Sequence, residues 1–358
     1  MKLVLCLALS TFAIHASTTY TVTDLGSLGG SYVYGYGVNS NGLVAGTSFT
    51  TGNAAFRAYI SDGVTITSLG TLGGANSEAF AINDAGQVTG YSPAQFNGNN
   101  HAFYWNGSAM IDLGTAGMAS SIGYGINNNG QVTGAALNGA NDQIAFLWDG
   151  TNILNLGGLG GTVSYGRAIN DSGQVAGSSN TAGNIRHAFL WNGTTMLDLG
   201  TLGGATSEGT GVNNAGFVTG YSDTAVPGTV SAFLWNGSTM TQLGAISGNA
   251  SYGRDVNNNN QVVGAAAYGN NAGLHAFVWS NGVMSDLNAV LVNAGGWVLG
   301  DALSINDAGQ IAGTGSLNGV QRAFLLTPVS EAPEPATALL IGASLLALYK
   351  SRKKTTTQ

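Results

Sequence analysis

Short apolar segments separated by turn residues run along the chain from about residue 20 to residue 327. Within residues 166–199, four apolar runs are separated by two turns rich in Asp, Asn and Gly and by one polar loop. Runs of this length, bounded by Gly, Asn, Asp and Ser, are typical of β-strands. We therefore predict strands over residues 166–170, 174–178, 187–191 and 194–199.

This pattern recurs seven times. An Asn that ends an Ile-Asn or Val-Asn pair returns at intervals of 43 to 49 residues; it stands at Asn39, Asn83, Asn127, Asn170, Asn213, Asn257 and Asn306. The Leu of Asp-Leu-Gly motifs and the Ala of His-Ala-Phe motifs recur with nearly the same spacing. Four strands in about 44 residues, repeated in this way, predict an all-β fold, a closed β-propeller of seven four-stranded blades.

The two ends of the repeat region predict how the ring closes. The region opens with a strand of the Asp-Leu-Gly type at residues 20–25 and stops with a strand of the Ala-Phe-Leu type at 322–326. Pairing of these two strands completes the last blade and removes an exposed sheet edge. A β-helix or an open solenoid would leave both strands without a partner.

A second local signal concerns the turn after the third strand of each unit. Asn-Gly or Asp-Gly occupies this turn in six of the seven copies. Such dipeptides favour two-residue hairpin turns, in which both central residues have positive φ. We also expect the five Trp that precede this turn to belong to the repeat core rather than to a cofactor site.

The charge of the repeat region argues against some classes of function. Between residues 17 and 330 there are 15 acidic residues, five Arg and no Lys. An acidic surface is a poor partner for nucleic acid, so nucleic-acid binding is not expected. The absence of Lys from this region excludes a Schiff base or a phosphate-loop Lys there.

The N-terminus reads as an export signal. Lys2 is followed by an apolar run and then by His15-Ala16, a pattern typical of a secretory signal peptide over residues 1–16. Cys6, the single cysteine, lies inside this segment, so no disulfide or thiolate chemistry is expected in the mature protein. The alternative is a buried N-terminal strand.

The C-terminus, residues 331–358, has three parts: Pro333-Glu334-Pro335, an apolar stretch of about a dozen residues, and a basic cluster. This pattern resembles the PEP-CTERM sorting signal. The resemblance implies recognition by an exosortase after secretion, and a location at the surface or outside of an exopolysaccharide-making Gram-negative bacterium. The membrane would be contacted only transiently, through the tail. The uncharged residues 355–358 depart from the usual end of such tails, and the alternative is a plain membrane anchor.

The repeat region, about 20–327 within a domain of residues 17–330, also resembles a known family. Its motifs at 199–204 (Leu-Gly-Thr-Leu-Gly-Gly), 82–90 (Ile-Asn-Asp-Ala-Gly-Gln-Val-Thr-Gly) and 101–103 (His-Ala-Phe) are similar to those of extracellular HAF-repeat proteins. The resemblance implies an exported repeat protein and no particular reaction. Only three of the seven copies carry the motif's His, namely His101, His187 and His275, which favours a structural His over a catalytic one.

The sequence contains few motifs of catalytic, cofactor-binding or metal-binding sites. The chain contains no GxSxG, no HExxH and no Cys pair, and its GxG pairs lie inside predicted strands, so no cofactor is expected. Asn and Asp gather in the Asn-Asp-Ala-Gly turns, where Asx side chains commonly bond the local backbone. Calcium is the alternative there, but the turns lack the carboxylate spacing of a calcium loop, and we predict no metal site.

The most informative positions are those where the repeats differ. The third and fifth residues before each repeat Asn should share one face of the first strand, which we expect to be the innermost. Together these positions place Tyr, Arg and Glu at the channel or its mouth. We predict that ligand-binding residues are among them: Tyr34, Glu78, Tyr165, Arg167, Glu208, Tyr252 and Arg254.

Aromatic rings beside Arg and carboxylates suit sugar rings and their hydroxyl groups. The variable loops are almost free of charge, which favours neutral glycans or protein contacts. We therefore expect a non-catalytic surface or matrix protein that binds exopolysaccharide or another envelope component. One alternative is a glycan-cleaving enzyme with Glu78 or Glu208 as the acid or base and with Arg167 and Arg254 nearby. Glycoside hydrolysis needs two carboxyl groups about 5–10 Å apart, and only a narrow channel would bring Glu78 and Glu208 within that range. The others are a structural or adhesive role, with these positions as an ordinary solvated channel lining.

Overall fold

The computed structural model describes residues 18–95, 98–138, 142–269 and 273–329. These residues form 28 β-strands and two short 3₁₀-helices, η1 (Thr51–Asn53) and η2 (Leu287–Val290). The predicted signal peptide (1–16) and the predicted sorting tail, with Pro333, Glu334 and Pro335, lie outside the described residues.

Within the described ranges, no helix is long and apolar enough to cross a membrane.

Consecutive strands pair into antiparallel groups of four. The first two groups are β2 (Gly29–Val38), β3 (Val44–Thr50), β4 (Phe56–Ser61) and β5 (Ile66–Ser68), then β6 (Glu78–Ile82), β7 (Val88–Pro93), β8 (Asn100–Trp105) and β9 (Met110–Asp112). The next two are β10 (Ser120–Ile126), β11 (Val132–Leu137), β12 (Gln143–Trp148) and β13 (Ile153–Gly157), then β14 (Gly160–Ile169), β15 (Val175–Thr181), β16 (Arg186–Trp191) and β17 (Met196–Asp198). A single parallel pair, Gln143 with Val163, joins these last two groups into one eight-stranded sheet.

Two further groups follow in the same way. They are β18 (Gly203–Val212), β19 (Val218–Thr224), β20 (Val230–Trp235) and β21 (Met240–Gly244), then β22 (Ser251–Val256), β23 (Val262–Ala267), β24 (Leu274–Ser280) and β25 (Val283–Asp286). The remaining sheet combines both ends of the described chain: β26 (Trp297–Ile305), β27 (Ile311–Leu317), β28 (Val320–Val329) and β1 (Thr19–Asp24).

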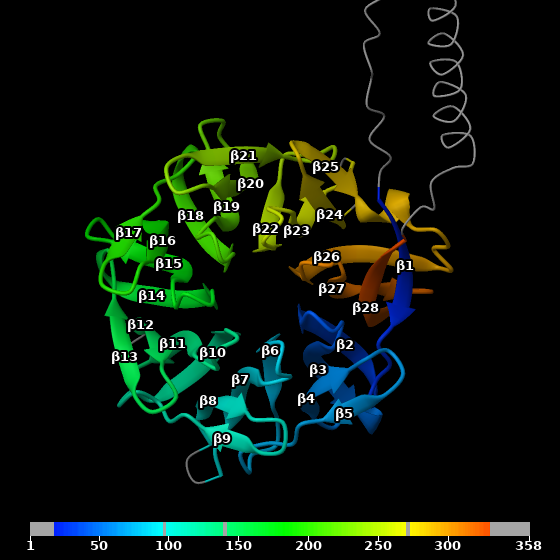
Figure 1. The fold of residues 1–358 in the computed structure, drawn as a ribbon, viewed down its shortest axis with the longest axis horizontal. Helices are drawn as coiled ribbons and strands as arrows, with labels where there is room; N and C mark the ends of the chain where they lie inside the picture. The colour runs from blue at the N-terminus through cyan, green and yellow to red at the C-terminus, as the bar shows by residue number, and fades with distance from the viewer. Residues whose placement is uncertain (1–17, 96–97, 139–141, 270–272, 330–358) are drawn as a thin grey trace, which may run out of the picture.

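The sheets stand side by side around a central opening, with the first strand of each group nearest the axis (Figure 1). This arrangement is a β-propeller, as the repeats predicted. The expected pairing of the two ends is confirmed, because β1 runs antiparallel to β28 from Thr19 opposite Val329 to Asp24 opposite Phe324.

The hydrophobic core is divided among the junctions between neighbouring sheets. One cluster, for example, joins Ala188 and Leu190 of β16 to Val218 of β19 and Phe233 of β20. The five repeat Trp belong to such clusters, as predicted: Trp191 and Trp235 are buried in them, and Trp105, Trp148 and Trp279 pack against them. Each sheet is therefore stabilised mainly by its neighbours.

The prediction for the hairpin turns is wrong in most copies. Only Asn281-Gly282 has two positive φ values and connects paired residues directly. In the other five turns only the Gly has positive φ, and the preceding Asn or Asp has not. The Asn106 side chain, for instance, accepts hydrogen bonds from the backbone amides of Ser108 and Ala109. This Asx turn satisfies the loop locally and makes the connection four residues long.

A β-bulge interrupts the innermost strand of every group at the same place. In β2, Gly35 pairs with Gly46 and Gly37 pairs with Ala45, so Tyr36 has no partner across the ladder. The equivalent shift occurs in β6, β10, β14, β18, β22 and β26. A Cβ on Gly46 would lie 1.9 Å from the Tyr34 carbonyl oxygen, which explains why the second strand carries Gly there.

The repeat Asn residues form a closed cycle of hydrogen bonds. The side-chain amide of each one donates to the backbone carbonyl of the Asn in the next sheet, and that of Asn306 donates to Asn39, at 2.8 to 3.2 Å. The side-chain oxygen of Asn127 also accepts from the backbone amides of Asn129 and Gln131. All seven residues are buried. One side chain thus closes its own turn and binds the neighbouring sheet.

We expect Asn127→Ala to lower the free energy of unfolding by about 2–4 kcal/mol, because several buried donors and acceptors would lose their partner. Urea denaturation followed by Trp fluorescence measures this loss. The exposed turn residue Asn106 offers the control, and Asn106→Ala should cost about 1 kcal/mol. Equal losses in the two variants would show that the buried cycle has no special importance.

Candidate functional site

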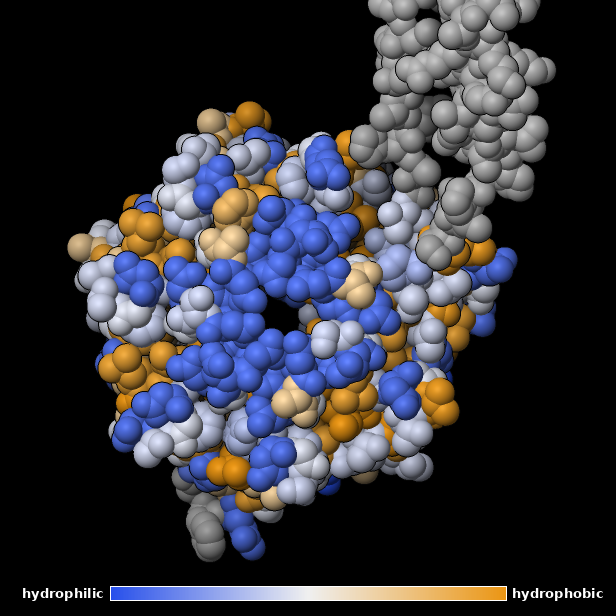
Figure 2. Space-filling view, viewed as in Figure 1, coloured by the Kyte–Doolittle hydropathy of each residue, from blue (hydrophilic) through white to orange (hydrophobic). Residues whose placement is uncertain are grey.

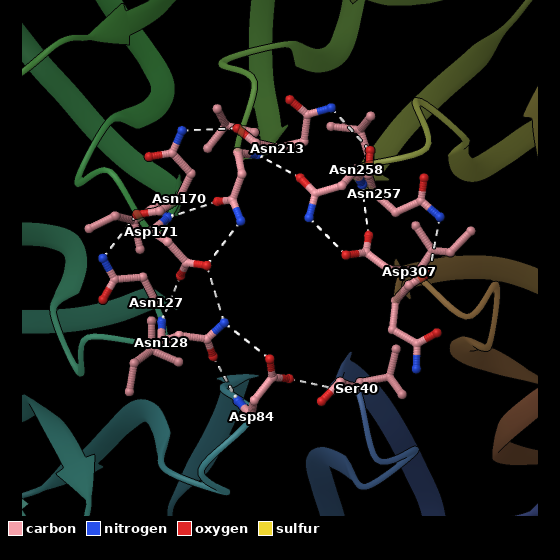
Figure 3. Close-up of a pocket in the computed structure, with 18 of the residues that line it drawn as sticks. Ser40, Asp84, Asn127, Asn128, Asn170, Asp171, Asn213, Asn257, Asn258 and Asp307 are labelled. Carbon is pink, nitrogen blue, oxygen red and sulfur yellow. Dashed lines mark hydrogen bonds between the residues drawn. The ribbon is translucent and has the colours of Figure 1, made fainter.

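One mouth of the central channel is a ring of amides and carboxylates. The residue after each repeat Asn belongs to it: Ser40, Asp84, Asn128, Asp171, Asn214, Asn258 and Asp307. From Ser40 to Asn258, each backbone amide donates to the side chain of the next member at 2.8 to 3.0 Å. The members of the ring that are labelled in Figure 3 surround the opening, and hydrophilic residues lie around it on this face (Figure 2).

The carboxylates of this ring are the ones that the calcium alternative would use as ligands. The Asp171 carboxylate, for example, accepts from the Asn128 backbone amide and from the side-chain amides of Asn128 and Asn214. Across the described residues, no group of three or more His, Cys, Asp or Glu is placed to hold a metal ion. The ring therefore joins neighbouring turns by hydrogen bonds.

Deeper in the channel, the wall is formed by the third residue before each repeat Asn. These are Tyr36, Phe80, Tyr124, Arg167, Thr210, Arg254 and Leu303. Each is the bulged residue of its strand, so the bulge directs its side chain into the channel. The fifth residue lies beside the third, as expected: Tyr34 stacks on Tyr36 with ring centroids 5.9 Å apart, and the Arg167 guanidinium lies over the Tyr165 ring at 5.1 Å.

Aromatic rings cover one side of this wall. Phe80 lies 5.3 Å from Tyr36, 5.5 Å from Tyr124 and 6.0 Å from Tyr91, measured between ring centroids. Glu78 lies among these rings and hydrogen-bonds Tyr91. Burial raises the pKa of Glu78, and the bond from Tyr91 lowers it by less.

The other side of the wall is polar and charged. The Glu208 carboxylate is 9% exposed and binds Arg167 at 3.3 Å, Arg186 at 3.2 Å and the Tyr221 hydroxyl at 2.8 Å. Burial, followed by the charge of Glu208, raises the pKa of Tyr221 to about 12. The Arg167 guanidinium also lies 4.6 Å from the Tyr124 ring centroid, which links the charged side to the aromatic side.

A second ion pair continues the charged side. Arg254 binds Asp301 through Nε and Nη2, with the shortest contact at 2.9 Å, and its guanidinium lies 5.8 Å from the Tyr252 ring. Tyr252 and Tyr221 meet edge to face at 5.2 Å. Desolvation raises the pKa of Asp301 more than Arg254 lowers it.

The predicted residues thus separate into two clusters. Tyr165, Arg167, Glu208, Tyr252 and Arg254 lie together, whereas Tyr34 and Glu78 belong to the aromatic side. In the part of the chain that the structure describes, Glu78 and Glu208 have separate partners, and no hydrogen bond joins them.

Three contributors were missed: Arg186, Tyr221 and Asp301. Arg186 and Tyr221 stand on β16 and β19, outside the strand whose positions were compared. Asp301 was one of the compared residues, but nothing along the sequence pairs it with Arg254, 47 residues away. For Arg186 a signal existed, because the other copies carry Phe56, Asn100, Gln143, Val230, Leu274 and Gln321 at that position.

The three His residues are explained by neighbouring carboxylates. His101, His187 and His275 each bind the Asp of the following Asp-Leu-Gly type strand at 2.8 to 2.9 Å. Arg322 takes the same place opposite Asp24, at 3.9 Å. Copies with Arg57, Ile144 or Ser231 instead have Ser68, Asn155 or Gln242 in place of the Asp. This covariation between the repeats supports the structural interpretation.

Comparisons with known proteins assign no family. No family model matches the chain, and no curated protein matches it. Solved structures with some likeness include a putative TolB from Agrobacterium tumefaciens (8% identity, TM-score 0.42, covering 88% of this chain and 100% of that one). Others are the Trypanosoma rangeli sialidase (9%, 0.38, 94% and 58%) and a six-bladed fucose-recognising lectin of Aleuria aurantia (14%, 0.36, 68% and 90%). At these values the likenesses give no argument about function.

A buried carboxylate in the channel wall, that of Asp255, predicts that the stability of the fold depends on pH. Asp255 stands where the other copies carry Gly, Ala or Ser, and it accepts hydrogen bonds from the Ile305 amide and the Ser304 hydroxyl of the next sheet. Desolvation raises its pKa more than these bonds lower it. The folded state therefore favours the protonated acid. The free energy of unfolding should therefore rise as the pH falls through the raised pKa of Asp255. The rise should end near pH 4, the ordinary pKa of Asp in the unfolded chain.

We expect the melting temperature to rise when the pH is lowered from 7.5 to 4.5, and to rise less, by about 1–3 °C, in Asp255→Asn, which has no charge to lose. Calorimetric melting at the two pH values measures the difference. Because Glu78 and Asp301 are present in both proteins, their contributions cancel in the comparison. An unchanged pH response in the variant would contradict the assignment to Asp255.

Proposed function

We propose that this chain is an exported, non-catalytic β-propeller of seven blades closed into a ring, and that the propeller face around the residues of the channel wall binds exopolysaccharide or another envelope component. The blade count is supported by the cycle of seven Asn residues and by the division of the eight-stranded sheet into two antiparallel groups of four. Closure is supported by the last bond of the cycle, from Asn306 to Asn39, and by the pairing of β1 with β28.

One observation supports glycan binding above all. The residues that stabilise the fold recur from sheet to sheet, whereas the bulged residue and the residue two before it differ between sheets. These variable residues bring aromatic rings, guanidinium groups and carboxylates together at one site. Aromatic faces pack on the C–H faces of sugars, and the fixed ion pairs present donors and acceptors to hydroxyl groups.

Export is supported by the two terminal segments. The N-terminal 16 residues have the pattern of a signal peptide, and the Pro333-Glu334-Pro335 tail resembles an exosortase substrate. In this proposal, the secretion machinery and an exosortase are the processing partners. The mature product reaches the surface or the extracellular matrix of a Gram-negative bacterium.

We expect the exported protein to begin at Ser17 and to have lost the residues that follow the Pro-Glu-Pro motif. Intact-mass spectrometry of protein recovered from the medium or cell surface of an exosortase-bearing host checks both ends. A Pro333→Ala, Pro335→Ala double variant should keep its tail. An exported protein that retains Met1 or Gln358 would contradict the corresponding half of the proposal.

We expect the purified protein to bind the producer's exopolysaccharide saturably, and Tyr165→Ala and Arg254→Ala each to weaken binding about tenfold, a loss of about 1.4 kcal/mol. Isothermal titration calorimetry measures this affinity. Tyr104→Ala and Arg57→Ala are matched controls, because Tyr104 packs on Trp148 and Arg57 donates to backbone carbonyls.

The titrated sugar should keep its chain length when analysed by mass spectrometry afterwards. Shortened chains would instead favour the glycan-cleaving alternative and direct attention to Glu208. Neither heat nor shortening would leave a structural or adhesive protein, with these residues as channel lining.

A further inference from the structure

Positive charge is concentrated on one side of the channel of an otherwise acidic molecule. The repeat region has five Arg and no Lys, and three of these five, Arg167, Arg186 and Arg254, belong to the charged side of the channel wall. Arg254 is balanced by Asp301. Glu208, in contrast, is shared by two guanidinium groups, so this cluster carries one positive charge that no carboxylate in contact balances.

The unbalanced charge belongs to Arg186. Its side chain is 47% exposed, against 31% for Arg167 and 9% for Glu208. Only Nη1 of Arg186 contacts Glu208. Among the described residues, its Nε and Nη2 have no hydrogen-bond partner, and these two groups form one edge of the guanidinium. A planar edge with two parallel N–H donors matches a carboxylate.

Arg186 stands in a pocket of about 420 Å³ between the β15–β16 loop and the first residues of β18. The pocket is also lined by the amide side chains of Asn180 and Asn184, and by Ile185 and Ala205. The Asn180 side chain donates to that of Asn184, which holds the loop in place and leaves the other amide groups for a ligand.

One more carboxylate lies close to this pocket. Thr206 forms part of the wall, and its backbone amide and hydroxyl both donate to Asp223. Asp223 is not itself among the lining residues. Both donors are neutral, so Asp223 keeps its negative charge, but among the described residues it forms no ion pair with Arg186.

We propose that this pocket binds a carboxylate-bearing sugar, a hexuronate unit of the glycan. The carboxylate accepts from Nε and Nη2 of Arg186, the ring C–H groups pack on Ile185 and Ala205, and the hydroxyl groups bond Asn180 and Asn184. This inference rests on the proposed function and names the class of sugar. The net charge of the repeat region, near −10, disfavours a dense polyanion and suits single uronate units spaced along a neutral chain.

The test compares methyl β-glucuronide with methyl β-glucoside, which differ only in the carboxylate, by NMR titration of the full-length protein. We expect the glucuronide to bind at least tenfold more tightly and its affinity to fall as NaCl is raised. Arg186→Gln should remove this preference. Arg57→Gln, which changes an Arg outside the pocket, should retain it.

Substitution of Glu208 distinguishes an anionic ligand from a neutral sugar that donates a hydroxyl group to Glu208, because the two cases predict opposite changes in affinity. If the ligand is anionic, Glu208→Gln removes a neighbouring negative charge and tightens glucuronide binding; a pocket that used Glu208 as a hydroxyl acceptor would bind more weakly. Arg186→Lys keeps the charge but loses the two-donor edge, and should give an intermediate preference even where the Glu208 variant fails to fold.

Equal binding of the two sugars, or an undiminished preference in Arg186→Gln, would overturn this inference. If the exopolysaccharide still bound, the proposed function would stand with a neutral ligand. If neither methyl glycoside nor the polysaccharide bound, the proposed function itself would fail.

Discussion

The buried side-chain amide of the repeat Asn is the interaction on which the rest of this structure depends. In each sheet its oxygen holds the turn between the first two strands, and its nitrogen holds the backbone of the next sheet. A residue with only a donor or only an acceptor cannot do both. Because the cycle returns from Asn306 to Asn39, the position of each inner strand is fixed relative to all the others.

A second constraint works inside that frame. The bulge in each inner strand directs one side chain into the channel, and the Gly of the second strand is needed because a Cβ there would meet a backbone carbonyl. The identity of the bulged residue differs from copy to copy. Each bulged residue stands three residues before the buried repeat Asn, so fixed packing and variable chemistry occur close together on the same strand, and this makes the channel wall the natural place for a binding site.

The difference between the two sides of the channel wall follows from particular substitutions between the repeats. Tyr36, Phe80 and Tyr124 form a continuous aromatic surface. Arg167 and Arg254 instead form ion pairs with carboxylates on the first strand of the next sheet. Burial of Glu208 between two guanidinium groups and a Tyr hydroxyl holds these side chains in place without a ligand. Preorganisation of this kind reduces the entropy lost on binding.

The sequence by itself determined the repeat, the order of strands within each unit and the pairing of the two ends, because these follow from the spacing of motifs and from an unpaired strand at each end. It also placed Tyr165, Arg167, Glu208, Tyr252 and Arg254 near one another, since equivalent positions in adjacent copies must be neighbours. Tertiary structure alone decided the turn geometry after the third strand, where the Asn side chain satisfies the loop instead of entering a left-handed conformation. It also brought Arg186 and Tyr221 to Glu208. Contacts between different strands of adjacent sheets depend on the length of the side chains and on the bulge, and the spacing of the repeats predicts neither.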